Sequence, residues 1–266
     1  MPHESQSRRD AIVHRATTTG LASVDELARE FRVTASTIRR DLGHLERAGR
    51  VARTYGGARA LVAHPEASLR QRLGESFEAK RAIAIWAASQ VCTGETILLD
   101  SGTTTGALAH ELRHAGPLTV VTTGMTALSE LATGASPRVE CLGGTLRPLS
   151  EGFVGPLTET ALERRTFDRV FLGADGITAD DGICEADGEQ TRLKELMTTR
   201  GHHIYVLVHG AKIGRRPFHT WAPLSRHWTL VTDDTVELSK LQPFYAKGVT
   251  VVTVDSEGKP TSRAKS

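Results

Sequence analysis

Apolar residues are arranged in two different patterns along the 266-residue chain. In residues 1–60, here called the head, apolar side chains recur every three or four positions, the spacing of helices that pack one face on a core. Beyond about Glu75 the apolar residues instead form short continuous runs separated by helical patterns. We therefore expect a head, a linker at 61–75, a larger domain at 76–256 and a polar tail at 257–266.

The larger domain is predicted to be built on a mainly parallel β-sheet. Helical patterns at 77–91, 107–113 and 190–199 lie between apolar runs that have the length and composition of strands. The runs are TILLD, LTVVTT, VECLG, RVFLG, IYVLV, WTLVT and VTVVTV. Runs that are apolar on both faces and alternate with helices are typical of a parallel sheet covered by helices. The predicted fold class is therefore α/β.

Three helices and a hairpin are expected in the head. The second helix begins at a capping box, in which Ser23 caps the helix and Glu26 stands three residues later. The third begins at Thr34, a plausible N-cap, and stops near Gly49. Short alternation with a Gly-Gly pair in residues 50–58 predicts the hairpin. Together these parts form a winged helix-turn-helix, which places its second helix in the major groove of DNA.

The third helix carries opposite characters on its two faces. Ile38, Leu42 and Leu45 share an apolar face, while basic and hydroxyl residues fall on the opposite side at about 100° per residue. Gly43 lies on that polar face, where it either lets the backbone approach DNA closely or is incidental. Asp41 would repel phosphate, so we expect it to pair with a basic residue inside the head. The predicted DNA contacts are Ser36, Thr37, Arg39, Arg40, Gly43, His44, Arg47, Arg53, Tyr55, Gly56 and Gly57.

Charge is unevenly divided along the chain. The head has 11 Lys and Arg against 7 Asp and Glu, a net +4, whereas the remainder carries a net −2. This asymmetry favours contact with DNA phosphates at one end only. No apolar run approaches the roughly 20 residues that cross a bilayer, and the polar N-terminus is unlike a signal peptide. We therefore expect a cytoplasmic protein with no membrane partner. Cys92, Cys141 and Cys184 lack metal-ligand spacing, so free thiols, no metal and no cofactor are expected.

Glycine, hydroxyl and charged residues follow five of the predicted strands. Ligands of parallel sheets bind at the carboxyl ends of strands, and helix N-terminal amides with nearby hydroxyls favour an anion such as phosphate. The run DSGTTTG at 100–106 is neither a P-loop nor a dinucleotide fingerprint. A small phosphorylated ligand is therefore expected, although Lys194 has a surface lysine as its alternative interpretation. The candidate residues are Asp100, Ser101, Gly102, Thr103, Thr104, Thr105, Thr123, Gly143, Gly144, Asp175, Lys194 and Lys212.

The head resembles the DeoR family of bacterial transcription regulators through VDELAREFRVTASTIRRDLGHLERAGRVARTYGGA. The larger domain is similar to the sensor domain of that family through LLDSGTTT, Gly143–Gly144, FLGADGI and the turn at Lys212–Gly214. The resemblance implies a sensor with the ribose-5-phosphate isomerase and CoA-transferase-like α/β fold. It also implies phosphorylated sugars as effectors, a homo-oligomer (dimer or tetramer) and, usually, repression of a carbohydrate-use operon.

Three positions depart from the family pattern. His209-Gly210-Ala211 precedes Lys212 where the family usually has Asp, Thr123 stands where Asn is common, and Gln190-Thr191-Arg192 replaces an acidic stretch. A carboxylate that contacts the sugar is therefore expected to be missing. Two alternatives to an effector-controlled regulator remain. One is a DNA-binding oligomer that has lost its ligand. The other is a sugar-phosphate isomerase with a DNA-binding head, for which Asp175, Glu185 and Glu189 are the candidate bases.

Overall fold

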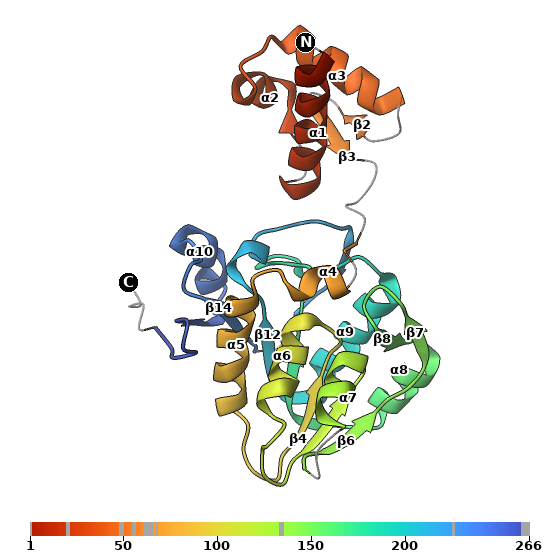
Figure 1. Ribbon diagram of the computed structural model, residues 1–266, viewed down its shortest axis with the longest axis vertical. Helices are drawn as coiled ribbons and strands as arrows, with labels where there is room; N and C mark the ends of the chain where they lie inside the picture. Colours follow the sequence, from red (N-terminus) through yellow and green to blue (C-terminus); the bar gives the residue numbers. More distant parts are fainter. Residues whose placement is uncertain are drawn as a thin grey trace. The chain divides into compact units, whose positions relative to one another are not determined.

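The computed structural model describes residues 2–19, 22–47, 51–54, 57–60, 66–67, 69–132, 136–224 and 227–261. The chain forms two compact units. One comprises Met1–Glu66 with Arg215–His219, and the other, here called the body, comprises Ala67–Gly214 with Thr220–Ser266. The head lies in the first unit, and the path of the chain through both is shown in Figure 1.

The head consists of three helices and a three-stranded antiparallel sheet. Its elements are α1 (Pro2–Thr19), β1 (Ala22–Ser23), α2 (Val24–Glu30), α3 (Ala35–Arg47), β2 (Val51–Thr54) and β3 (Gly57–Ala60). β2 and β3 pair as the expected hairpin, and β1 adds to β3. The buried core comprises Ile12, Leu27, Ile38, Leu42 and Leu45. The helix-turn-helix head and the apolar face predicted for its third helix are thus confirmed.

Hydrogen bonds at the helix ends and one internal ion pair shape the head. Ser23 and Glu26 form the predicted capping box, each backbone N–H donating to the side chain of the other at 3.1 Å. Asp41 is buried on α3, where its carboxylate accepts a 2.7 Å hydrogen bond from Arg8 Nε and lies 3.8 Å from Arg9 Nε. The prediction that Asp41 pairs inside the head is therefore confirmed.

A seven-stranded parallel sheet forms the centre of the body. Its strands are β4 (Thr96–Leu99), β5 (Thr119–Thr122), β6 (Arg138–Cys141), β9 (Phe167–Leu172), β12 (Gly201–Leu207), β14 (Thr229–Asp233) and β15 (Thr250–Val254). They are ordered β15-β14-β12-β9-β4-β5-β6, and each pairing is parallel. These are the seven runs predicted from the sequence, so the α/β fold class is confirmed.

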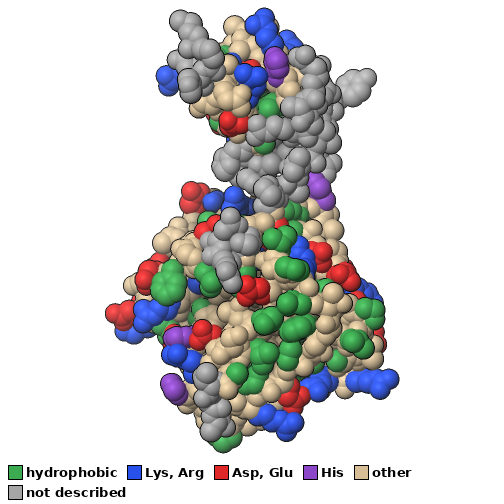
Figure 2. All heavy atoms as spheres, turned by 45° about the vertical axis from the view of Figure 1, so that its right-hand side comes forward, with side chains coloured by type: hydrophobic (Ala, Val, Ile, Leu, Met, Phe, Trp, Pro, Cys, Tyr) green, Lys and Arg blue, Asp and Glu red, His purple; other side chains and the backbone are tan. Residues whose placement is uncertain are grey.

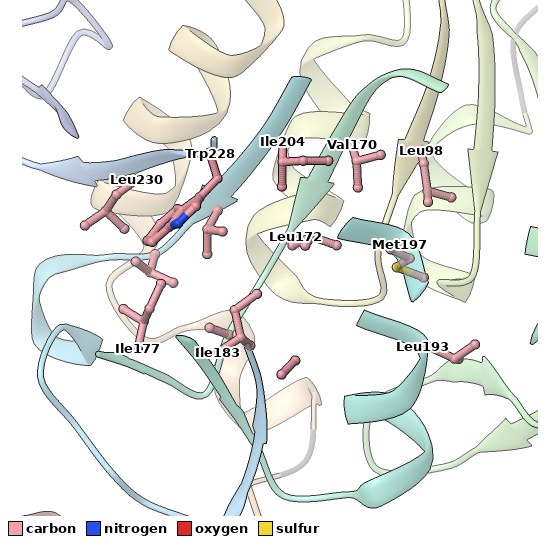
Figure 3. Close-up of a cluster of buried hydrophobic side chains, with 14 of the residues drawn as sticks. Leu98, Val170, Leu172, Ile177, Ile183, Leu193, Met197, Ile204, Trp228 and Leu230 are labelled. Atoms are coloured by element: carbon pink, nitrogen blue, oxygen red, sulfur yellow. The ribbon is translucent and has the colours of Figure 1, made fainter. Parts of the chain in front are cut away.

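Helices cover both faces of the sheet. The first face carries α5 (Phe77–Ser89), α6 (Thr103–Glu111) and α7 (Met125–Leu131), and the second carries α8 (Pro156–Glu163), α9 (Gly188–Arg200) and α10 (Leu238–Ala246). Alternate strand residues feed the two cores, because successive side chains of a strand point to opposite faces. Ile97 and Leu99 pack with α5–α7, whereas Leu98 packs with α8–α10 in the cluster of Figure 3.

Several short elements of the body were not expected from the sequence. They are α4 (Leu69–Leu73), β7 (Thr145–Arg147), β8 (Gly152–Val154), β10 (Gly176–Thr178), β11 (Gly182–Glu185), the 3₁₀ turn η1 (Gly210–Lys212) and β13 (Thr220–Ala222). α4 lies within the segment predicted as a linker. In the predicted tail, Thr261 N donates to Thr253 O at 2.8 Å, so the chain returns to β15 before it ends. Among the described residues, no helix has both the length and the apolar character needed to cross a membrane.

Candidate functional site

A pocket lies at the carboxyl ends of three neighbouring strands in the middle of the sheet. The loop after β4, the loop after β9 and the turn η1 after β12 all contribute to it, together with α9, β11 and α4. Its lining residues are Arg72, Ser101, Gly102, Thr103, Thr104, Ser150, Gly173, Ala174, Asp175, Glu185, Gln190, Lys194 and Lys212. The free cavity measures about 20 Å³, which is room for about one water molecule. The pocket is therefore largely filled by its own side chains.

Lys194 of α9 forms the charged floor of the pocket. Its Nζ lies 2.9 Å from Asp100 Oδ2, donates to Gly173 O at 2.8 Å and makes a short hydrogen bond to Glu185 Oε1. These contacts use the three donors that a lysine ammonium offers. Lys194 is 2% exposed, so the alternative interpretation of a surface lysine is wrong.

The burial of this cluster shifts the proton affinities of its members. Burial alone lowers the pKa of Lys194, but the carboxylates of Asp100 and Glu185 outweigh it and raise that pKa above its ordinary value. Burial raises the pKa of Glu185 to about 7, against the opposing attraction of Lys194. One ammonium thus stands between two carboxylates, and burial makes Glu185 easier to protonate than an exposed glutamate.

The segment after β4 forms the first turn of α6 and is held by Asp100. α6 begins at Thr103, so the threonines predicted to lie in a loop form the first turn of the helix, where backbone amides are not used by the hydrogen bonds of the helix itself. Asp100 fixes this turn, because Oδ1 accepts from Ser101 N and its carbonyl accepts from Thr105 Oγ1, both at 2.7 Å. Helix N-terminal amides favour a phosphate or carboxylate.

Two further cations border the pocket. Lys212 Nζ donates to Ala174 O at 2.5 Å, and burial lowers the pKa of Lys212 although Asp175 opposes this shift. Arg72 of α4 donates through Nη1 to Asp175 Oδ1 at 2.9 Å. Lys80 Nζ donates to the backbone carbonyl of Arg72 at 2.5 Å, and burial together with the charge of Lys212 lowers the pKa of Lys80 to about 8. Arg72, Lys80 and Lys212 are thus close enough for their charges to affect one another.

The structure brings some of the predicted ligand residues together and leaves others apart. Ser101 to Thr104, Asp175, Lys194 and Lys212 line the pocket, and Asp100 lies beneath it through Lys194. The remaining candidates are outside the lining: Thr105, Thr123, Gly143 and Gly144. Thr123 is buried and accepts a 2.7 Å hydrogen bond from Phe153 N. Thr123 follows β5, and Gly143 and Gly144 follow β6. These strands lie one and two places beyond β4 in the sheet, whereas the pocket lies at the ends of β12, β9 and β4.

Four side chains of the pocket were missed or assigned differently from the sequence. Arg72 stood in the predicted linker, Ser150 in an unassigned loop, and Glu185 was considered only as a catalytic base. Gln190 was noted only as a departure from the family, yet it lines the pocket, and its Nε2 donates to Ser101 Oγ at 3.3 Å. Gln190 begins the helical pattern predicted at 190–199 and lies on the first turn of α9, but that pattern alone did not place it at the pocket. Among the residues described, no cluster suits a metal ion.

The DNA-facing candidates lie mainly on the exposed side of α3. Ser36, Arg39, Arg40 and His44 are exposed, and a Cβ built at Gly43 would meet no atom within 4 Å. Thr37 is half-buried. α3 and the hairpin contain Arg47, Arg53 and Gly57, but the side chains of Arg47 and Arg53 lie outside the described residues, as do Tyr55 and Gly56 altogether. The helix thus presents arginines on the face opposite its apolar core.

Comparison with known families decides the identity of both parts. Residues 8–63 match the DeoR-like helix-turn-helix domain, and residues 75–234 match the DeoR C terminal sensor domain. The chain belongs to the DeoR family. It is a DNA-binding transcription regulator, as the resemblance of its motifs implied.

Relatives within the DeoR family align along nearly the whole chain. The HTH-type transcriptional regulator GlpR of Haloferax volcanii is 32% identical over 92% of this chain and 96% of its own length. The glycerol-3-phosphate regulon repressor of Escherichia coli K12 is 29% identical, over 88% and 93%. The lactose phosphotransferase system repressor of Streptococcus mutans is 31% identical, over 85% and 91%.

Among solved structures, ribose 5-phosphate isomerase A of Methanocaldococcus jannaschii is similar to part of this DeoR-family chain. It covers 50% of this chain and 52% of its own, at 19% identity and a TM-score of 0.37. This likeness is too distant to bear on function.

Proposed function

We propose that this DeoR-family regulator is a repressor whose affinity for its DNA operator is controlled by a small phosphorylated metabolite, a sugar phosphate or a related compound. The observation that carries the proposal is the pocket at the ends of β4, β9 and β12, where the first turn of α6 lies among Lys212, Arg72 and Asp175. The relatives named after glycerol 3-phosphate and the lactose phosphotransferase system support the same ligand class.

The polar groups of the pocket fit two ends of such a ligand. Its phosphate would bind the amides of the first turn of α6 and the hydroxyls at Ser101–Thr104 with Lys212 as the cation, which is the chemistry of anion sites at helix N-termini. Its hydroxyls would donate to Asp175. Gln190 stands where the family has an acidic stretch, but it lines the pocket and its amide can also hydrogen-bond a hydroxyl of the ligand. The departure at this position therefore does not rule out a sugar ligand.

We further propose that the protein works without catalysis, as a cytoplasmic homo-oligomer. Glu185, the base considered for an isomerase, is 4% exposed and bonded to Lys194, so it is not free to act on a ligand. The body also carries exposed apolar side chains at Leu146, Leu149 and Leu157, which favour self-association. Figure 2 shows apolar side chains gathered over one face of the body.

The full-length protein should respond to phosphorylated compounds and not to their unphosphorylated counterparts. The operator is first obtained by letting the protein select DNA from a random pool. Glycerol 3-phosphate, ribose 5-phosphate and hexose 6-phosphates are then compared with glycerol, ribose and hexoses. At 100 times its dissociation constant, a ligand specific for the native state adds about 3 kcal/mol of stability, which raises the melting temperature by several degrees.

The same panel is measured by fluorescence anisotropy of labelled operator, and the active compound is expected to change affinity about 5–150-fold. If no compound changes either the melting temperature or the operator affinity, the ligand-independent oligomer is the better description. Conversion of a sugar phosphate to its isomer by the purified protein would favour the enzyme instead.

Replacement of Arg40 by Ala is expected to weaken operator binding without unfolding the head, because Arg40 is exposed on the face opposite the core. If Arg40 contacts guanine, the loss is about 1–3 kcal/mol and discrimination disappears at one base position. If it contacts phosphate, binding weakens for all sequences and the salt dependence falls by about one charge. Arg164→Ala, at an exposed arginine of the body, is the charge-matched control. Wild-type operator affinity in Arg40→Ala would contradict the assignment of this face.

A further inference from the structure

We propose that Arg72 is a latch between the ligand pocket and the segment that leads to the head: it holds α4 in place through Asp175, and a phosphorylated ligand releases it. In this mechanism the phosphate pairs with the guanidinium of Arg72, and the ligand hydroxyls donate hydrogen bonds to the carboxylate of Asp175. Contacts with the ligand thus replace the ion pair between the two residues. The proposal rests on the proposed function for the class of ligand, and it adds a residue and a route of regulation.

α4 depends on a few contacts for its position. It has five residues, and a helix of that length is unstable by itself because nucleation costs more than so few hydrogen bonds return. The helix is held where Leu69, which is buried, donates its N–H to Leu149 O at 2.8 Å, where Arg72 pairs with Asp175 at 2.9 Å, and where Lys80 Nζ donates to Arg72 O at 2.5 Å.

One of these three contacts ends at the pocket, and a second ends next to it. Asp175 lines it directly, and Leu149 immediately precedes Ser150, which also lines it. Arg72 reaches a residue 103 positions further along the chain, so the first helix of the body is fixed by the loop after β9. A change in the pocket therefore acts on α4 without passing through the sheet.

The size of the cavity indicates which side chain moves. The free space of about 20 Å³ has room for about one water molecule, and a sugar phosphate is several times larger. Lys194 is held by three buried contacts, and Ser101 to Thr104 belong to the turn fixed by Asp100. Arg72 enters the pocket from a short helix, and its side chain is 14% exposed. Arg72 is therefore the side chain that shifts from Asp175 to the ligand.

Charge favours the same exchange. Arg72, Lys80 and Lys212 are close enough that the charges of Lys212 and Arg72 help burial to lower the pKa of Lys80. Asp175 offsets this excess in the ligand-free pocket. A phosphate dianion offsets it more completely, so it can replace the carboxylate as the partner of Arg72.

Two variants should open the latch without ligand. Arg72→Met removes the guanidinium, and Asp175→Asn leaves Arg72 in place but removes its anionic partner. Both are expected to lower the operator affinity of the ligand-free, full-length protein at least about fivefold, toward the affinity of the ligand-bound wild type. Hydrogen exchange at the amides of residues 69–75 should become faster in both. Arg164→Met, at an exposed arginine of the body, should leave both quantities unchanged.

The outcomes separate the latch from the ligand. Suppose that the wild type responds to a sugar phosphate. If Asp175→Asn then keeps the wild-type operator affinity and the wild-type hydrogen exchange at 69–75, the latch is overturned and the proposed function stands. If both variants lower operator affinity and speed hydrogen exchange at 69–75, while the wild type responds to no compound of the panel, the link from Arg72 and Asp175 to the head is supported and the proposed ligand class is contradicted. If Arg72→Met fails to fold, Asp175→Asn and Arg72→Lys decide, since Arg72→Lys keeps the charge but loses the planar donor pair.

Discussion

Replacement of Lys194 by Met is expected to destabilise the body by about 3–5 kcal/mol, because it leaves the carboxylates of Asp100 and Glu185 buried without their cation. Urea unfolding followed by tryptophan fluorescence measures this loss. Trp86, Trp221 and Trp228 are the three tryptophans of the chain, and all lie in the body, so the signal reports on that unit.

The loss should depend on pH in a defined direction. Burial raises the pKa of Glu185 to about 7, and without Lys194 the neutral form is favoured further. The destabilisation of Lys194→Met relative to wild type should therefore shrink as the pH falls from 8 to 6, since protonation removes one of the two stranded charges. Adding Glu185→Gln to Lys194→Met should recover part of the stability at pH 8.

Exposed Lys240 supplies the matched control, because Lys240→Met removes the same charge and should change stability by less than about 0.5 kcal/mol. A loss below about 1 kcal/mol in Lys194→Met, or a loss that grows toward pH 6, would show that the cluster does not hold its charges as described.

Replacement of Leu42 by Ala should abolish DNA binding by unfolding the head. Leu42 is fully buried in a core of five buried apolar residues, and deletion of such a side chain costs about 2–5 kcal/mol. A unit of about 60 residues has little stability to spare. Circular dichroism at 222 nm should lose the helical signal of the head at lower temperature, and anisotropy should show loss of operator binding.

Leu42→Met preserves the volume of the side chain and should cost less than about 1.5 kcal/mol, so it should keep operator binding. Tryptophan fluorescence should report the same urea midpoint in both variants as in wild type, because no tryptophan lies in the head. Normal operator binding by Leu42→Ala would contradict the assignment of this core, and a shifted urea midpoint would show that the two units unfold together.

The large elements of both units could be predicted because each has a strong local signal. The seven sheet strands are continuous apolar runs, and buried parallel strands need apolar residues on both faces. α3 has a clear apolar side, and Ser23 with Glu26 marks the start of α2 by a fixed spacing. The residues that follow β4 and β9 could be placed in a ligand pocket for the same reason, since they stand directly at predicted strand ends.

The rest of the pocket depends on contacts between distant parts of the chain. β7, β8, β10, β11 and β13 have only three or four residues each, too few for a periodic pattern to stand out. Lys194 could not be placed from its own helix, because α9 buries Gln190, Thr191 and Thr198 as well as apolar residues and so lacks a clear apolar face. Arg72 meets Asp175 only through the path of the chain between them.

The strand order β15-β14-β12-β9-β4-β5-β6 has a consequence for how such regulators diversify. From β4 the chain proceeds outward through β5 to β6, then returns to β9 on the other side of β4 and proceeds in the opposite direction. The loops after β4 and β9 leave the sheet edge in opposite directions, and a crevice forms at this topological switch point. The position of the pocket is thus set by the winding of the chain. Substitutions in its loops can change the chemistry of the pocket while its place in the fold stays the same.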